Sequence, residues 1–293
     1  MPSLEEILSH KRMEVEALKA RLRRAGSTTV MKGVGQVRSV RQAISGTLSG
    51  KGMAIIPELK KADPWRGVLH DRYQAIQYAH DLFKAGAPVL AMQTDTRYFG
   101  GSIEELYSIS RRVKVPMVMR DFIVDEAQIT EGKAKGADAV VLTAGLLEKE
   151  QLAAYIKFAD YIWMESIVEV SKADELEMAL NAGAKMIGVQ NRDLHSQTIQ
   201  IERTLALKQE IPKDVTSVVV GGISEPADIT TFRDAGFEAA VIGDMLMRAK
   251  SLSETYTVLA AQAAQQPDST PEVGEANADG PEPHDEDTKP SVG

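Results

Sequence analysis

The chain of 293 residues contains no cysteine. This absence excludes disulfides, thiolate metal sites and a cysteine nucleophile, so any chemistry has to come from carboxylates, lysines, arginines or the backbone. Long apolar runs are also missing, because no stretch approaches the roughly 20 consecutive apolar residues of a membrane span. The first residues, Met1 to Leu8, lack the basic-then-apolar layout of a secretory signal. We therefore expect a soluble, cytoplasmic protein that does not bind membranes.

An excess of positive charge is absent as well. The formal net charge is −8, and seven of these negative charges fall in the last 27 residues, where eight acids face Lys289 alone. The rest of the chain is nearly balanced, which gives no support to a nucleic-acid-binding face. Residues 265–293 are also rich in proline and poor in large apolar side chains, so they predict a disordered acidic tail. Its partner is unknown, and a solvated extension is the simpler interpretation.

Four glycines each end a helix-like segment and lead directly into an apolar run. They are Gly86, Gly136, Gly183 and Gly236, and they lie 47 to 53 residues apart. Glycine suits the left-handed position that ends a helix, and an apolar run suits a parallel strand buried on both faces. Each interval is about two strand-plus-helix units, so the pattern predicts an α/β protein with eight units, a (β/α)8 TIM barrel over residues 53–264.

The predicted barrel strands are short and apolar. A doubly wound open sheet would give a similar local pattern, but no Gly-x-Gly-x-x-Gly follows the first strand, where that fold carries its nucleotide fingerprint. The strands are expected near Met53–Leu59, Val89–Met92, Met117–Arg120, Ala139–Leu142, Ile167–Val170, Met186–Val189, Ser217–Val220 and Ala239–Ile242.

Residues 1–52 form an N-terminal helical extension ahead of the first strand. Apolar residues recur at helical spacing between Leu4 and Arg24, which predicts one amphipathic helix. We expect this helix to be a lid that closes the bottom or the rim of the barrel, and a partner-binding helix is the alternative.

Charged and amide side chains occupy the carboxyl ends of several predicted strands. Glu58 and Lys60 end the first strand, Arg120 the third and Glu169 the fifth, and the sixth is followed by polar residues up to Arg192. The active site of a barrel lies at this end of its strands, and a buried charge is costly unless it is paired or functional. A ring of buried ion pairs, such as Glu58 with Arg120, is the alternative interpretation.

The last two strands end in small residues instead. Gly221 and Gly222 follow the seventh strand, and Gly243 with Asp244 follows the eighth. Glycine lets backbone N–H groups approach an anion, and this is the usual phosphate position in barrels. We therefore expect a phosphorylated small-molecule ligand here, although the Asp244 side chain would repel an anion if it pointed inward.

With these segments laid out, the chain resembles the indole-3-glycerol phosphate synthase family over about residues 1–250. The matching stretches agree with the family in residue identity, in order and in spacing. They are Ile7-Leu-Ser-His-Lys-Arg-Met-Glu-Val-Glu-Ala-Leu-Lys, Ile56-Pro-Glu-Leu-Lys-Lys-Ala-Asp-Pro, Gln93-Thr-Asp-Thr-Arg-Tyr-Phe-Gly-Gly-Ser, Val115-Pro-Met-Val-Met-Arg-Asp-Phe-Ile-Val-Asp, Ile167-Val-Glu-Val, Ile187-Gly-Val-Gln-Asn-Arg-Asp-Leu, Gly222-Ile-Ser and Ile242-Gly-Asp-Met-Leu-Met.

The resemblance implies a ring closure in tryptophan biosynthesis. An arylamino deoxyribulose phosphate cyclises, loses CO2 and then water, and becomes an indole that carries a glycerol phosphate. No metal or organic cofactor is implied, and the five scattered histidines show no metal-ligand spacing. Residue by residue, the resemblance assigns Glu58 and Lys60 to the family's first-strand pair, Glu169 to its fifth-strand carboxylate, Arg192 to its sixth-strand arginine, Phe99 to a wall of the aryl pocket, and Gly222 and Gly243 to its phosphate loops.

Several positions depart from the family pattern. The family's catalytic lysine is Arg120 here, and arginine is too weakly acidic to deliver a proton, although it can stabilise an anion. Gln190 replaces an asparagine, Val220 and Gly221 replace a glutamate and a serine, and Asp63 replaces a serine. Losing one general acid typically costs about 10²–10⁴ in rate. Because the remaining site residues are kept, we interpret the pattern as a re-tuned site rather than a decayed one.

Three hypotheses for the function follow. The first is a lyase of the family's own reaction, with Lys60 as the acid and Arg120 binding the carboxylate or the developing oxyanion. The second is a re-purposed enzyme for another phosphorylated sugar-amine or keto substrate. The third is a barrel that binds a phosphorylated ligand without turning it over. The predicted catalytic residues are Glu58, Lys60, Arg120 and Glu169, and the predicted substrate-binding residues are Phe99, Gln190, Arg192, Gly221, Gly222, Gly243 and Asp244.

Overall fold

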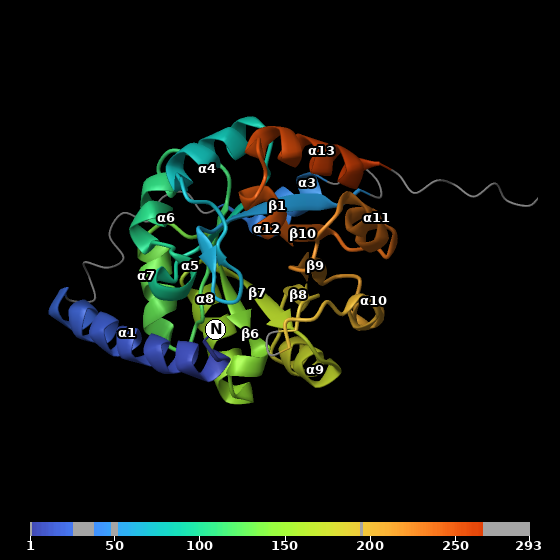
Figure 1. Ribbon diagram of the computed structural model, residues 1–293. Coiled ribbons are helices and arrows are strands. Elements are labelled where there is room, and N and C mark those ends of the chain that lie inside the picture. The colour runs from blue at the N-terminus through green and yellow to red at the C-terminus, as the bar shows by residue number, and fades with distance from the viewer. Residues whose placement is uncertain (1, 26–37, 48–51, 194–195, 266–293) are drawn as a thin grey trace, which may run out of the picture.

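The computed structural model describes residues 2–25, 38–47, 52–193 and 196–265 as a closed barrel of parallel strands surrounded by helices (Figure 1). Around the barrel the strands follow the order β1, β10, β9, β8, β7, β6, β5, β4, and β4 pairs with β1 to close the ring. Their bounds are β1 Ala54–Leu59, β4 Leu90–Gln93, β5 Met117–Arg120, β6 Ala139–Thr143, β7 Glu165–Val170, β8 Met186–Gln190, β9 Thr216–Val220 and β10 Ala239–Ile242. The predicted TIM barrel is confirmed.

Helices follow the strands in turn and form the outer ring. A two-stranded antiparallel ribbon, β2 Ala62–Asp63 and β3 Gly67–Val68, interrupts the loop after β1. The helices are α1 Leu4–Ala25, α3 Val40–Thr47, α4 Ala75–Lys84, α5 Thr96–Phe99, α6 Ile103–Ser110, α7 Glu126–Ala134, α8 Lys149–Tyr161, α9 Ala173–Asn181, α10 Ile201–Glu210, α11 Pro226–Asp234, α12 Asp244–Met247 and α13 Leu252–Ala264, with a 3₁₀ turn at Ala144–Leu146.

The four glycine joints explain why helices and strands alternate where they do. Gly86, Gly136, Gly183 and Gly236 all have a positive φ of 85–92°, which is the left-handed region that side chains with a Cβ avoid. Each of them ends a helix and turns the chain into the next strand within a few residues. The backbone requirement that the sequence pattern indicated is therefore met at every joint.

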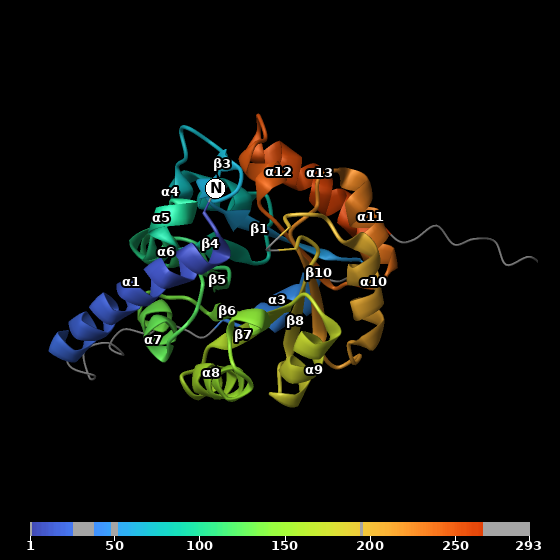
Figure 2. The same cartoon turned by 60° about the horizontal axis from the view of Figure 1, so that its bottom comes forward.

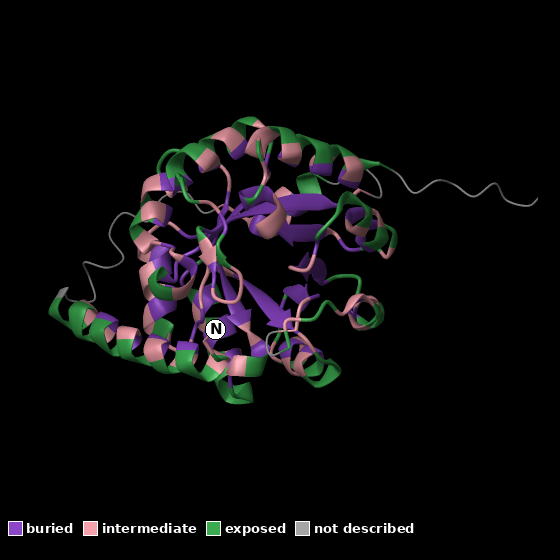
Figure 3. Ribbon diagram, in the orientation of Figure 1, coloured by how far each residue is buried: buried purple, intermediate pink, exposed green. Residues whose placement is uncertain are grey.

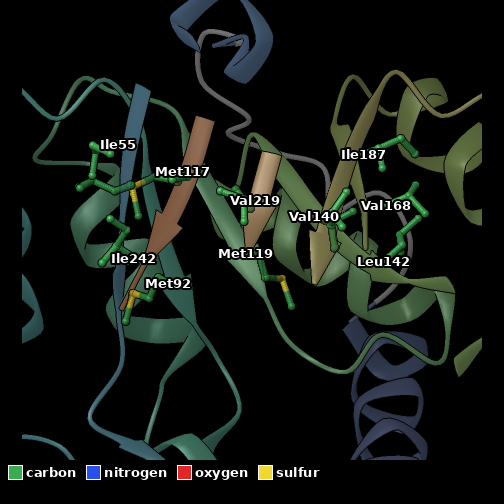
Figure 4. Packing of buried hydrophobic residues seen from close by; sticks show 14 of the residues in the cluster. Ile55, Met92, Met117, Met119, Val140, Leu142, Val168, Ile187, Val219 and Ile242 are labelled. Atoms are coloured by element: carbon green, nitrogen blue, oxygen red, sulfur yellow. The ribbon is translucent and has the colours of Figure 1, made fainter. Parts of the chain in front are cut away.

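Two large hydrophobic cores hold the barrel together, and a third, smaller cluster lies beneath α1. The larger core lies between the strands and the helices, and it is filled mainly by branched aliphatic and methionine side chains (Figure 4). The smaller core lies inside the barrel and includes Val118, Val141 and Val218. The barrel strands are buried over nearly their whole length, whereas the helices expose their outer faces (Figure 3). Parallel sheets covered on both faces require this distribution.

Helix α3 closes the bottom of the barrel, a role that the glycine-rich sequence around it did not reveal. Val40 and Ile44 are fully buried and join the inner core. The Glu165 carboxylate at the start of β7 accepts hydrogen bonds from the Val40 N–H (2.6 Å) and the Ser39 hydroxyl (2.7 Å). The start of α3 is thereby fixed to the amino ends of the strands, opposite the predicted site.

Helix α1 runs along α7 and brings its first turns to the opposite end of the barrel (Figure 2). Ile7 is fully buried there against Phe99 and Phe122. Within the described residues no helix is long and apolar enough to cross a membrane. The predicted acidic tail, residues 265–293, lies outside the described residues from position 266 onward.

Candidate active site

A cavity of about 370 Å³ opens at the carboxyl ends of the strands. Ten of the eleven predicted site residues line it, and the remaining one, Glu169, lines a small adjoining cavity together with Arg120 and Gln190. The structure therefore brings together side chains that are up to about 190 positions apart in the sequence. This is the position at which barrel enzymes place their active sites.

The end of strand β1 and the residue after it supply the first two charged groups. Glu58 and Lys60 are two residues apart, so the alternation of an extended chain turns both toward the same side, into the cavity. Both are buried, at 5% and 7% exposure. Buried charges at this depth need partners, and the neighbouring strands provide them.

Arg120, at the end of β5, bridges two carboxylates. Its Nε lies 2.7 Å from Glu58 Oε1, and its Nη1 donates a hydrogen bond of 2.5 Å to Glu169 Oε1. Burial works against the charge on Arg120, yet Glu169 and Glu58 together raise its pKa above the ordinary value. For Glu58, burial alone would raise the pKa, but Lys60 and Arg120 outweigh it and hold the pKa below the ordinary value. The expected ion pair between Glu58 and Arg120 is present.

Two glutamines complete the hydrogen bonding of these carboxylates. Gln93 at the end of β4 donates to Glu58 Oε1 at 3.0 Å, and Gln190 at the end of β8 donates to Glu169 Oε2. Each carboxylate thus contacts the Arg120 cation on one side and an amide on the other. Sequence reasoning missed Gln93, although its place at a strand end is the same signal that identified Gln190.

Lys60 is surrounded by three carboxylates. Its Nζ lies 2.6 Å from Asp244 Oδ1, 3.4 Å from Glu58 Oε2 and 3.5 Å from Asp63 Oδ2. The other Asp244 oxygen pairs with Arg66, which comes from the loop after β1. Asp244 therefore does point inward, and it joins the loops after β1 and β10 across the cavity. Of these residues Arg66 was not identified from the sequence, because a charge in a loop gives no directional signal.

Glycines shape the end of the cavity beyond β9 and β10. Gly221 and Gly222 both have φ +67°. A Cβ on Gly222 would lie 2.7 Å from the side-chain nitrogen of Asn191, and one on Gly243 would lie 2.4 Å from Glu58 Oε2. Both distances are shorter than real Cβ contacts, so glycine is what allows the backbone to approach the site here.

Arginines face this glycine-lined end. The Arg192 side chain is partly buried and donates a hydrogen bond of 2.7 Å to the Gln197 carbonyl. Burial and the neighbouring charge of Arg66 lower the pKa of Arg192 below its ordinary value. Because Arg66 already pairs with Asp244, Arg192 is the cation here that an entering anion would stabilise most.

The other end of the cavity is aromatic. Phe99 and Trp65 line it, and the Lys60 ammonium lies 6.0 Å from the centre of the Phe99 ring. Phe122 packs beside Phe99 with 6.1 Å between ring centres. A cavity with an aromatic end, a charged centre and a glycine-lined cationic end suits an elongated ligand with an aryl group and an anionic group. Among the described residues no cluster of three histidines or carboxylates is arranged to hold a metal ion.

Comparisons with known proteins agree with this geometry. The sequence model of the indole-3-glycerol phosphate synthase family matches residues 4–259. The chain belongs to the indole-3-glycerol phosphate synthase family. The indole-3-glycerol phosphate synthase of Chloroherpeton thalassium is 34% identical over 253 residues, 86% of this chain and 97% of that protein. That of Koribacter versatilis is 39% identical over 208 residues, 71% of this chain and 80% of that protein.

Solved structures show the same barrel at low sequence identity. The 3-hexulose-6-phosphate synthase of Salmonella typhimurium superposes with a TM-score of 0.58 and 14% identity, covering 72% of this chain and 98% of that chain. Likeness at this identity concerns the fold alone. The family assignment rests on the sequence matches, and the members of this family are carboxy-lyases.

Proposed function

We propose that this protein catalyses the family's reaction, the cyclisation and decarboxylation of an arylamino deoxyribulose phosphate to an indole glycerol phosphate, with Lys60 rather than Arg120 as the proton donor. The observation that carries this assignment is the contact of Arg120 with both Glu58 and Glu169. Arginine stays protonated in proteins, so in this position it can stabilise negative charge but cannot deliver a proton.

Lys60 is the remaining acid in the right place. Among the described residues that line the main cavity it is the one lysine, and the lowered pKa of Glu58 makes that carboxyl group a poor proton donor. As the aryl carbon attacks the ketone, the ketone oxygen gains negative charge, and a proton from Lys60 would neutralise it. Arg120 stabilises the same developing charge electrostatically.

The later steps need a base and an exit for CO2 and water. After decarboxylation restores the aromatic ring, the hydroxyl group leaves as water and a proton is lost from the forming five-membered ring. We assign the base to Glu169, which faces the cavity from β7 with Gln190 and Arg120 as its partners. The phosphate group belongs beside Gly221, Gly222 and Gly243, with Arg192 as its countercharge.

A second candidate is a re-purposed enzyme that acts on another phosphorylated sugar-amine or keto substrate. The observation that favours it is the pair of aspartates on Lys60, because Asp63 and Asp244 occupy an ammonium that would otherwise attract the substrate's own carboxylate. On either proposal the ligand is a phosphorylated small molecule and the reaction takes place in the cytoplasm. The partner of the acidic tail stays unassigned.

The test is a fluorescence assay of the purified protein with carboxyphenylamino-deoxyribulose phosphate, in which the indole product is followed. We expect turnover by the native protein and a loss of about 10²–10⁴ in kcat for Lys60→Met, the range for a lost general acid. Lys61→Met is the matched control, because Lys61 is the neighbouring, exposed lysine on the same loop and does not line the cavity.

Arg120→Lys separates the candidates. In an enzyme of the family's reaction it restores the family's lysine and should raise activity. In a re-purposed enzyme it should abolish the native activity on the other substrate. If neither the native protein nor Arg120→Lys forms product, although both bind the substrate tightly, the family reaction is refuted and a binding or a different catalytic role remains.

A further inference from the structure

Helix α1 carries a buried lysine that the proposed reaction does not use. Lys11 is 3% exposed, and its ammonium lies 2.7 Å from Asp95 Oδ2, 2.9 Å from Asp121 Oδ1 and 2.7 Å from Glu14 Oε2. Glu14 belongs to α1 itself, whereas Asp95 follows β4 and Asp121 follows β5. A single side chain of the N-terminal extension therefore joins the carboxyl ends of two neighbouring barrel strands.

Asp95 connects Lys11 to the aromatic wall of the cavity. Its Oδ1 accepts hydrogen bonds from the N–H groups of Tyr98 (2.6 Å) and Phe99 (3.2 Å), and so it caps the short helix α5. The same carboxylate offers its other oxygen, Oδ2, to Lys11. Asp95 is fully buried, so these partners replace the water that it lacks, and Phe99 is positioned through them.

Asp121 connects Lys11 to the charged centre of the cavity. It directly follows Arg120 in the sequence. Its carboxylate accepts hydrogen bonds from the Phe122 N–H (2.7 Å) and from the Thr94 hydroxyl (2.9 Å). The Thr94 N–H in turn donates to the Arg120 carbonyl at 2.9 Å. The backbone that follows the Arg120 Cα, from its carbonyl group to Phe122, is therefore fixed by a network that includes Lys11.

Apolar contacts of α1 act on the same wall. Ile7, one turn before Lys11, is fully buried against Phe99 and Phe122, and Trp65 packs beside them. The helix thus reaches the cavity wall through an apolar contact and through a buried cation. The apolar contact alone would not neutralise Asp95 and Asp121, which lie close to the same ammonium and would repel one another without it.

We propose that Lys11 is a positioning residue of the active site, which acts through Asp95 on Phe99 and through Asp121 on Arg120. Its kinetic consequence rests on the proposed function, whereas its structural consequence does not. The N-terminal extension is then part of the active site, since it supplies the charge that aligns two strand ends. Misplacing a catalytic group by about 1 Å can cost roughly 10²-fold in rate.

The kinetic test is Lys11→Met, which keeps the length and volume of the side chain but removes its charge. We expect kcat to fall by about 10- to 100-fold with KM changed less than about threefold, because Arg120 acts on charge that develops in the transition state. Lys11→Arg restores the charge and should recover most of the lost kcat. Lys19→Met is the matched control: Lys19 lies on the same helix and pairs with Glu16 and Asp125, away from the cavity.

A second measurement needs no substrate. Trp163 is 74% exposed, so Trp163→Phe leaves Trp65 as the single tryptophan reporter beside Phe99 and Phe122. In this background Lys11→Met should shift the Trp65 emission to the red and increase its quenching by acrylamide, while Lys19→Met should leave both unchanged. If the native protein shows no turnover, the proposed function fails, and this measurement still decides the role of Lys11.

The proposal is overturned if folded Lys11→Met keeps the kcat and the Trp65 emission of its parent, or if Lys19→Met lowers both as much. It is also overturned if Lys11→Arg recovers neither. If Lys11→Met does not fold, Lys11→Met combined with Asp121→Asn removes one of the opposed carboxylates together with the cation. If the proposal is right, the Trp65 emission of the double variant lies to the red of that of the Trp163→Phe parent. If the proposal is wrong, the two emissions are equal.

Discussion

Replacing Arg120 by methionine should destabilise the protein strongly, and more so at alkaline than at acidic pH. The substitution removes the cation that contacts Glu58 and Glu169, whose side chains are only 7% and 2% exposed. Breaking a buried ion pair by removing one partner costs about 3–5 kcal/mol, because the charge left behind has lost its compensation. Gln93 and Gln190 remain as uncharged hydrogen-bond donors. Lys60 stays 3.4 Å from Glu58 Oε2, so Glu58 loses one of its two cations, whereas Glu169 loses the cation that it contacts.

The pH dependence follows from the direction of the Glu58 shift. In the native protein the pKa of Glu58 is lowered, so its pairing stabilises the fold above the unfolded pKa and is lost as the pH falls through the folded pKa. Without Arg120 the pKa of Glu58 should rise, and the carboxyl group can then take up a proton on mild acidification. The penalty of the substitution should therefore be largest near pH 8 and smaller near pH 5.

The assay is urea unfolding, followed by tryptophan fluorescence and far-UV circular dichroism at both pH values. A penalty of about 3–5 kcal/mol corresponds to a midpoint lowered by roughly 1–2 M urea for a domain of this size. Arg21→Met is the control, because Arg21 is 59% exposed and pairs with Glu131 at the surface, where an ion pair is worth less than about 1 kcal/mol. A penalty for Arg120→Met below about 1 kcal/mol, or one that is equal at both pH values, would refute the buried charge network.

Three further substitutions test other parts of the site and scaffold. Gly243→Ala places a Cβ 2.4 Å from Glu58 Oε2, so it should cost about 1–3 kcal/mol in unfolding free energy and lower turnover; unchanged turnover would contradict the close approach. Asp244→Asn frees Lys60 from its nearest carboxylate and should tighten binding of inorganic phosphate about fivefold, measured by Trp fluorescence; weaker binding would show that the aspartate does not compete with anions. Glu165→Gln weakens the anchor of α3 and should lower the free energy of unfolding by about 1–3 kcal/mol with kcat retained, because it lies at the far end of the barrel; a loss of kcat in folded protein would contradict this separation.

The barrel could be predicted because its signals are local. A glycine with positive φ and an apolar run after it are properties of a few consecutive residues, and their recurrence at Gly86, Gly136, Gly183 and Gly236 sets the number of units. The same locality explains why α3 was missed. The helix closes the barrel because Val40 and Ile44 fill the inner core. Eight residues in a glycine-rich segment are too few to show the hydrophobic periodicity that would predict this role.

It could also be predicted that the candidate residues at strand ends lie together, because the barrel itself gathers its strand ends in one place. Glu58, Lys60, Arg120 and Glu169 needed only the rule that the active site of a barrel lies at the carboxyl ends of its strands. No comparable rule predicts which loop residues lie at the cavity. Arg66 pairs with Asp244 only because the loop after β1 folds across the cavity, and the chain gives no sign of that path.

The sequence by itself determined the class of fold, the family and the set of ionisable groups, since each depends on residue types at fixed spacing. Only the tertiary structure decided which charged side chains form ion pairs with one another. It assigned Arg120 to Glu58 and Glu169, left Lys60 among three carboxylates, and buried Lys11 of the N-terminal helix between Asp95 and Asp121. The physical reason is that a charge is neutralised by whatever lies within a few ångströms of it, and those neighbours come from distant parts of the chain.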